Sequence, residues 1–218
     1  MYSPRIIELI ELLALLLLMA ILAKVVRGIS RRRKLKDLAQ DLGGRVVAGL
    51  FRQSAYIPNQ GIETRIETRP SSIFKPKYLI LEQPCRIGFK LTIDKIEPLL
   101  NFTSRTGFEL TKYKREPALH TAVRMMDGCE RLDPQPECLN GHALARASDL
   151  TMASNFLMDP KKRMAVGFFL KEGFFEIVAA NDKLVLKKPD YSDNDLAPAR
   201  VKETLRQMKE FSGEQTGP

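Results

Sequence analysis

The stretch FFEIVAANDKLVLKK, residues 174–188, decides the fold class of this chain. Apolar residues alternate with other residues on both sides of Asn181-Asp182, a pair that tolerates positive φ. The pattern predicts a β-hairpin, in which the two strands run antiparallel. It therefore argues against a doubly wound parallel sheet. The sequence also contains neither of the glycine-rich nucleotide-binding patterns, G-x-G-x-x-G and G-x-x-x-x-G-K.

Strands and helices without a regular alternation are predicted around this hairpin. Four further strands are expected upstream, at residues 62–69, 78–82, 86–93 and 108–113, and one more at 143–147. Helices are expected from Glu116, from Asp149 to about Met158, from Pro160, and along the stripe Val201, Leu205 and Met208. The irregular order of elements predicts an α+β fold with a largely antiparallel sheet and packed helices.

The composition of the 218 residues excludes wholesale disorder, since 44% are hydrophobic and 28% charged. The length suits one domain with an appendage. Three cysteines are too few for a disulfide scaffold, and an odd number fits a reducing compartment better than secretion. The aromatic residues Phe168, Phe169, Phe174 and Phe175 are expected in the core, although they could also line an apolar groove.

The N-terminal segment is predicted to cross a membrane. Fourteen of the residues from Ile6 to Val26 are Ile, Leu or Val, and about 20 helical residues cross a bilayer. Glu8, Glu11 and Lys24 lie near the ends of this run, where charges cost less. The helix is expected to continue to about Leu42, with a possible break at Gly28. A cleaved signal peptide and a helix lying in the membrane interface remain alternatives.

Basic residues follow the apolar run directly, and no acidic residue interrupts them. They are predicted to contact anionic headgroups at the membrane surface: Lys24, Arg27, Arg31, Arg32, Arg33, Lys34 and Lys36. By the positive-inside rule they place the N-terminus outside and the C-terminal domain in the cytoplasm. The expected location is a bacterial inner membrane, crossed once. Topology accounts for these charges more simply than binding of nucleic acid does, so no nucleic-acid partner is expected.

Three regions are expected along the chain. Residues 1–44 form the membrane helix and the basic helix that follows it, because Gly43-Gly44 supplies a stop. Residues 45–212 form the soluble α+β domain, and residues 213–218 form a polar tail.

The order of these elements resembles a loose group of bacterial single-pass membrane proteins. The resemblance rests on a basic helix ending in Leu38-Ala-Gln-Asp-Leu-Gly-Gly44, on Ala143-Leu-Ala-Arg-Ala-Ser-Asp149, and on the hairpin Phe174 to Lys188. It implies a mixed α/β cytoplasmic domain of unknown function, and it brings no catalytic residues.

The one constellation of metal-ligand residue types is Cys129, Cys138 and His142. Thiolates and imidazoles are zinc ligands, but the spacings C-x8-C and C-x3-H lack the C-x2-C knuckle of zinc sites. Two loop cysteines and a surface histidine explain the pattern more simply. His120 is expected on the polar side of its helix, in contact with solvent. Cys85 lies elsewhere in the sequence. A thiol nucleophile would need a histidine held beside it, and this spacing does not provide one.

The sequence therefore predicts a membrane-anchored binding or assembly module that acts through a protein partner. It predicts neither a cofactor nor a catalytic motif. The alternative is a membrane-bound metal- or thiol-dependent enzyme that uses Cys129, Cys138 and His142.

Overall fold

The computed structural model describes residues 4–48, 53–59, 61–69, 77–95, 128–139 and 143–213. Their strands form one antiparallel sheet in the order β1-β2-β3-β4-β9-β8-β5-β7-β6. The first five strands are Arg45–Ala48 (β1), Gln53–Asn59 (β2), Ile62–Arg69 (β3), Tyr78–Pro84 (β4) and Leu91–Lys95 (β5). The others are Glu130–Arg131 (β6), Ala143–Ala147 (β7), Glu176–Ala180 (β8) and Lys183–Pro189 (β9).

The helices lie at both ends of the chain and between β7 and β8. They are α1 (Pro4–Asp41), α3 (Leu150–Met158), α4 (Pro160–Lys171) and α5 (Pro198–Ser212). Two short 3-10 turns, η1 (Glu137–Leu139) and η2 (Asp193–Leu196), complete the described elements. The α+β class with a largely antiparallel sheet and packed helices is confirmed.

The predicted hairpin is present and lies in the middle of the sheet. Asn181 and Asp182 have φ values of 52° and 58°, and they connect β8 to β9. The hairpin inserts between two strands that are neighbours in sequence, because β9 pairs with β4 and β8 pairs with β5. The residues from 174 to 188 thus join the two halves of the sheet.

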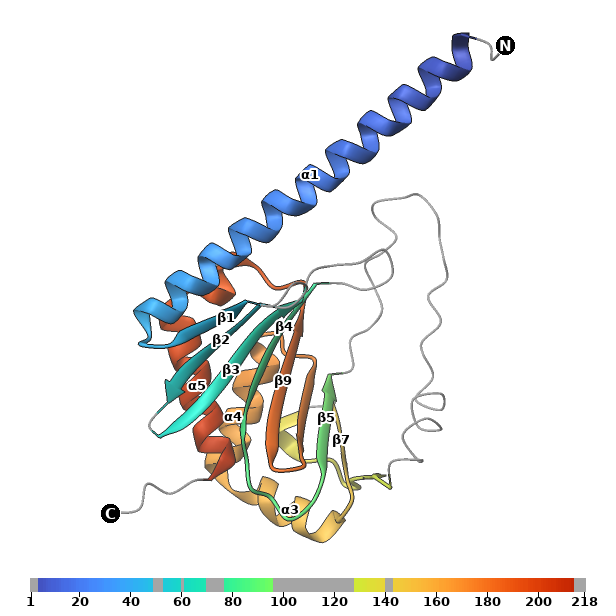
Figure 1. The fold of residues 1–218 in the computed structure, drawn as a ribbon. Helices are drawn as coiled ribbons and strands as arrows, with labels where there is room; N and C mark the ends of the chain where they lie inside the picture. Colours follow the sequence, from blue (N-terminus) through green and yellow to red (C-terminus); the bar gives the residue numbers. More distant parts are fainter. Residues whose placement is uncertain are drawn as a thin grey trace.

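One face of the sheet carries a continuous apolar row across seven strands. Paired positions put these side chains side by side, and all are almost fully buried: Ala55, Ile66, Leu81, Leu186, Ile177, Ile93 and Ala145. The buried stripe of α5, which includes the predicted Val201, Leu205 and Met208, belongs to the same hydrophobic core. Helices α4 and α5 lie together beside the sheet (Figure 1).

The predicted helix starts are confirmed by their N-caps. The Asp149 carboxylate accepts a hydrogen bond from the Met152 amide (2.9 Å), and Asp159 accepts one from the Lys161 amide (2.8 Å). Pro160 occupies the first turn of α4, where its missing N–H costs nothing.

The other face of β3 differs from its prediction. Alternation of apolar or threonine residues with charged ones predicts a half-buried strand, but on its charged face Glu67 is only 3% exposed. Its two carboxylate oxygens accept hydrogen bonds from Arg65 and Arg69, each at 2.6 Å. Residues two apart on a strand share a face, so the two guanidinium groups cover the carboxylate between them.

The strands in the first half of the chain differ in part from their prediction. The strand predicted at residues 86–93 begins only at Leu91, because the preceding residues form a loop that brings Phe89 against Phe156 (5.7 Å between ring centroids). Strands β1 and β2 were not predicted. The strand expected at 108–113 and the helix expected from Glu116 lie outside the described residues.

Helix α1 continues without a break through Gly28 and ends at Asp41, close to its predicted end. Gly43 has a φ of +68°, and the Gly44 amide donates to the Ala39 carbonyl oxygen (2.6 Å). A Cβ on Gly44 would lie 2.4 Å from the Tyr56 carbonyl oxygen, so glycine is needed where the chain turns into β1.

The two ends of α1 have different surroundings. Leu35, Leu38 and Ala39 near its C-terminus are at most 2% exposed and belong to the hydrophobic core. The N-terminal part projects away from the sheet (Figure 1). As for the expected transmembrane helix at about residues 6–26, no helix in the described part of the chain is both long and apolar enough to cross a membrane.

Candidate functional site: a basic groove beside α1

A groove of about 640 Å³ lies where the C-terminal half of α1 meets the start of the sheet. Its basic and polar lining comes from α1, and its apolar lining comes from α1 and β1. The lining residues are Ile29, Arg32, Arg33, Lys36, Ala39, Gln40, Gly44 and Val46. The volume falls within the range of about 300–1,000 Å³ that small-molecule sites occupy.

Helical periodicity produces this groove. Ile29, Arg32, Arg33, Lys36 and Gln40 are separated by three or four residues, so they share one face of α1. The neighbouring face carries the buried leucines that pack into the core. Burial of that second face fixes the rotation of α1, and the basic face is thereby held beside β1.

The cations of the groove have no partner of opposite charge among the described residues. No described carboxylate forms an ion pair with Arg32, Arg33 or Lys36, although all three side chains are exposed. Asp37 and Asp41 do not line the groove. Lys34 differs, since it forms an ion pair with Asp193 of η2. Within the described part of the chain, these three cations are thus not neutralised by a carboxylate.

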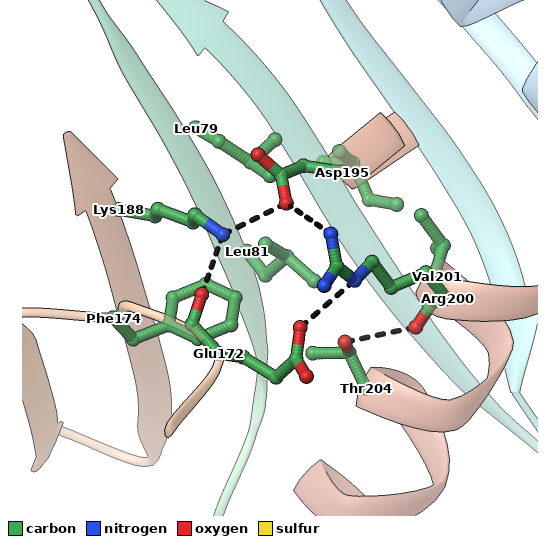
Figure 2. Close-up of a pocket in the computed structure, with 10 residues that line it drawn as sticks. Leu79, Leu81, Glu172, Phe174, Lys188, Asp195, Arg200, Val201 and Thr204 are labelled. Atoms are coloured by element: carbon green, nitrogen blue, oxygen red, sulfur yellow. Dashed lines mark hydrogen bonds and ion pairs between the residues drawn. The ribbon is translucent and has the colours of Figure 1, made fainter. Parts of the chain in front are cut away.

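A second, much smaller cavity of about 10 Å³ lies between β9, η2 and α5 (Figure 2). Asp195 is one of its lining residues, and its carboxylate accepts hydrogen bonds from Lys188 (2.8 Å) and Arg200 (3.0 Å). Arg200 also pairs with Glu172 (2.8 Å), and Lys188 donates to the Glu172 carbonyl oxygen. The cavity holds a single water at most.

The Asp195 cluster is a structural joint. Burial by itself would raise the pKa of Asp195, but hydrogen bonds from Lys188 and from the Ser192 amide outweigh it and lower the pKa below its usual value. The carboxylate is therefore ionised and fully engaged by its neighbours, which connect β9, η2, α5 and the end of α4. A group in this state is not available for proton transfer.

The predicted metal-ligand residues do not form a site within the described chain. Cys129 is buried after Gly128, Cys138 is half-buried in η1, and His142 and His120 lie outside the described residues. No group of three or more His, Cys, Asp or Glu side chains among the described residues could hold a metal ion. Cys85 is buried in the core at the end of β4.

The Cys138 thiol is also poorly suited to chemistry. Burial raises its pKa, and this effect outweighs its backbone hydrogen bond and the charge of Arg163. A raised pKa disfavours the thiolate that both a nucleophile and a zinc ligand require.

The phenylalanine cluster is mostly core, as expected. Phe169 and Phe174 are almost fully buried, with their ring centroids 6.1 Å apart and nearly perpendicular. Phe175 is half-buried and stacks on Tyr78 (6.1 Å between ring centroids).

The sequence predicts three cations of the groove as surface contacts, but it does not predict the groove. Arg32, Arg33 and Lys36 were predicted to contact the membrane surface, and the structure places them together. The side chains of Lys24, Arg27 and Arg31 lie outside the described part. Ile29, Gln40 and Val46 were missed, and the shared helical spacing of Ile29 and Gln40 with the cations was the signal that could have found them.

The fold and the groove define an α+β protein in which a long N-terminal helix packs its last turns on an antiparallel sheet. The sequence matches no known protein family and no curated protein. Among solved structures, the chain is similar to the mycobacterial trehalose monomycolate transport factor A, TtfA, with a TM-score of 0.52. The match has 12% sequence identity and covers 83% of this chain and 92% of that one, so the likeness extends to the fold alone.

Proposed function

We propose that this protein is a membrane-anchored binding or assembly module. In this proposal the N-terminal part of α1 anchors it, and the sheet domain acts through contacts with a protein partner rather than through catalysis. The observation that carries the proposal is the exposed apolar surface of the projecting part of α1.

That surface surrounds the helix. Large hydrophobic side chains from Leu12 to Val26 are between 50% and 64% exposed, including six in the run Leu12, Leu13 and Leu15 to Leu18. Consecutive residues point in different directions around a helix, so this surface is not a single stripe. A helix that is apolar on all sides is stable when it is buried, and an amphipathic helix at a membrane interface has one polar face instead. This argument favours immersion in lipid.

The anchor is coupled to the domain by one continuous helix. Leu35 and Leu38 fix the C-terminal turns of α1 in the core, and Lys34 pairs with Asp193. No flexible linker separates the apolar segment from the sheet, because α1 runs unbroken from Pro4 to Asp41. The domain would then be held at a set orientation to the bilayer, as suits a module that assembles with a membrane partner.

The similar solved structure belongs to a transport factor. TtfA is, by its name, a mycobacterial trehalose monomycolate transport factor. At 12% identity this likeness supports the fold alone, so the proposed role of this chain beside a membrane rests on α1 and not on the neighbour. The enzyme alternative gains no support from Cys138, whose raised pKa disfavours a reactive thiolate.

Membrane attachment is tested by extraction of the full-length protein from membranes. We expect the wild type to stay in the pellet after alkaline carbonate treatment, and the Leu15→Arg/Leu18→Arg variant to appear in the supernatant. Each arginine near the middle of an apolar helix costs about 3 kcal/mol on an insertion scale. The matched control is Leu15→Ile/Leu18→Ile. Release of the wild type by carbonate would refute the anchor.

The orientation is tested separately by fusion of alkaline phosphatase after Pro218 in a bacterial host. Seven basic residues from Lys24 to Lys36 follow the apolar run, so the domain is expected to face the cytoplasm and the fusion to be inactive. A fusion to a fluorescent protein that folds in the cytoplasm should be bright. An active phosphatase would reverse the orientation and make a Cys129–Cys138 disulfide the first bond to look for.

A further inference from the structure

We propose that the basic groove between α1 and β1 is a specific site for the phosphate headgroup of an anionic phospholipid. This inference rests on the proposed membrane anchor and adds to it a defined ligand. General attraction to a charged surface needs only dispersed cations, whereas a groove that holds three of them together can bind one lipid molecule in a fixed place.

The groove lies at the depth where a headgroup is found. At a rise of 1.5 Å per residue, Arg32 is about 9 Å beyond Val26 along α1 and Lys36 about 15 Å beyond it. The headgroup layer extends roughly 5–8 Å beyond the hydrocarbon on each side. Arginine and lysine side chains reach several ångströms along a helix toward the membrane, which brings their charges into that layer.

The lining matches the parts of such a lipid. Arg32, Arg33 and Lys36 offer donors to a phosphate, and guanidinium groups bind phosphate oxygens in pairs. Ile29 lies on the membrane side of the cations and is 60% exposed, which suits the start of an acyl chain.

Nucleic acid fits this lining less well. Binding of single strands combines cations with aromatic side chains on which bases stack, and none of the described residues that line the groove is aromatic. The cations also occupy only two turns of α1, directly beside the apolar segment.

The inference is tested with the full-length protein in an uncharged maltoside detergent. Dihexanoyl phosphatidylglycerol is titrated below its critical micelle concentration, with dihexanoyl phosphatidylcholine as the neutral-headgroup comparison. We expect saturable binding of one phosphatidylglycerol per chain and no saturable binding of phosphatidylcholine. In the Arg32→Gln/Lys36→Gln variant we expect about 100-fold weaker binding, roughly tenfold for each charge-assisted hydrogen bond that is lost.

The matched control is Lys161→Gln/Lys202→Gln, which removes the same charge from exposed positions on α4 and α5 and should bind as the wild type does. Arg33→Glu and Ile29→Glu are single variants of exposed residues that should also weaken binding. Equal thermal unfolding of all variants shows that the fold is intact. If a groove variant unfolds at a lower temperature than the wild type, the lipid binding of the other groove variants tests the inference.

Three results would overturn the inference. These are equal binding of both lipids, equal loss in the control variant, or competition by a single-stranded oligonucleotide at lower concentration than phosphatidylglycerol. Carbonate extraction separates this inference from the membrane anchor. If the wild type resists extraction but binds no phosphatidylglycerol, the lipid site is refuted and the anchor is not. If the wild type is extracted, the anchor is refuted whatever the protein binds.

Discussion

Replacement of Leu35 or Leu38 by alanine is expected to lower the free energy of unfolding by about 2–5 kcal/mol. Both side chains are at most 2% exposed and belong to the core cluster of the sheet domain. Each substitution removes buried methyl and methylene groups and leaves a cavity that the sheet cannot fill. Since these leucines belong to α1, the result would show that the N-terminal helix is part of the folded domain.

Chemical denaturation of the full-length protein in detergent measures this loss. Leu15→Ala is the control, because it makes the same chemical change on the projecting part of α1, where the side chain is 57% exposed, and it should alter stability by less than about 0.5 kcal/mol. Equal effects of the Leu38 and Leu15 variants would contradict the packing of α1. The predicted division at residue 44 stays a prediction, and it gains a direct test. If the domain begins at residue 45, removal of residues 1–44 should preserve cooperative unfolding. The burial of Leu35 and Leu38 in the core predicts instead that removal of 1–44 weakens it, whereas removal of 1–30 does not.

The hairpin shows what the sequence could predict. Alternation on both sides of Asn181-Asp182 is local information, and the turn requires positive φ at two adjacent positions. The caps Asp149 and Asp159 are equally local, since each carboxylate bonds an amide two or three residues ahead. Predictions of this kind were confirmed because the interactions that determine these turns and caps involve residues only a few positions apart.

The predictions that failed depend on residues far apart in the chain. Glu67 is the exception, because the two arginines that cover it lie only two residues away on the same strand, and alternation of polarity does not reveal that contact. Strand order was not predictable, since β4 pairs with β9 from the far end of the chain. The groove likewise depends on β1 lying beside α1. The helical spacing of its cations can be seen in the sequence, but the position of β1, which forms the other side of the groove, cannot.

The second large effect on stability is expected from substitution of Asp195. Asp195→Asn is expected to destabilise the protein by about 3–5 kcal/mol at neutral pH, as removal of one partner does in a buried ion pair. Lys188 is the reason, because its side chain is only 15% exposed and donates to the lost carboxylate. An asparagine carbonyl can still accept one hydrogen bond, but it brings no charge to offset the buried ammonium group.

The control is Asp193→Asn in the same 3-10 turn. Its ion pair with Lys34 is mostly solvent-exposed, so its loss should cost at most about 1 kcal/mol. Thermal and urea unfolding of the three proteins at pH 7 measure both effects. Equal, small effects would mean that Asp195 is not the joint between β9, η2 and α5.

Acid titration tests the same cluster through its charge. The pKa of Asp195 is lowered in the folded protein, so its ionised form contributes stability above the unfolded pKa of about 3.9. That contribution is lost as the pH falls through the folded pKa. The stability difference between wild type and Asp195→Asn should therefore be constant from pH 7 to about pH 5 and should shrink below about pH 4. Glu203, whose pKa is lowered to about 2 by hydrogen bonds from Arg206 and Gln207, is present in both proteins and cancels from the difference. A difference that stayed constant down to pH 2 would show that the cost of the substitution comes from shape and not from charge.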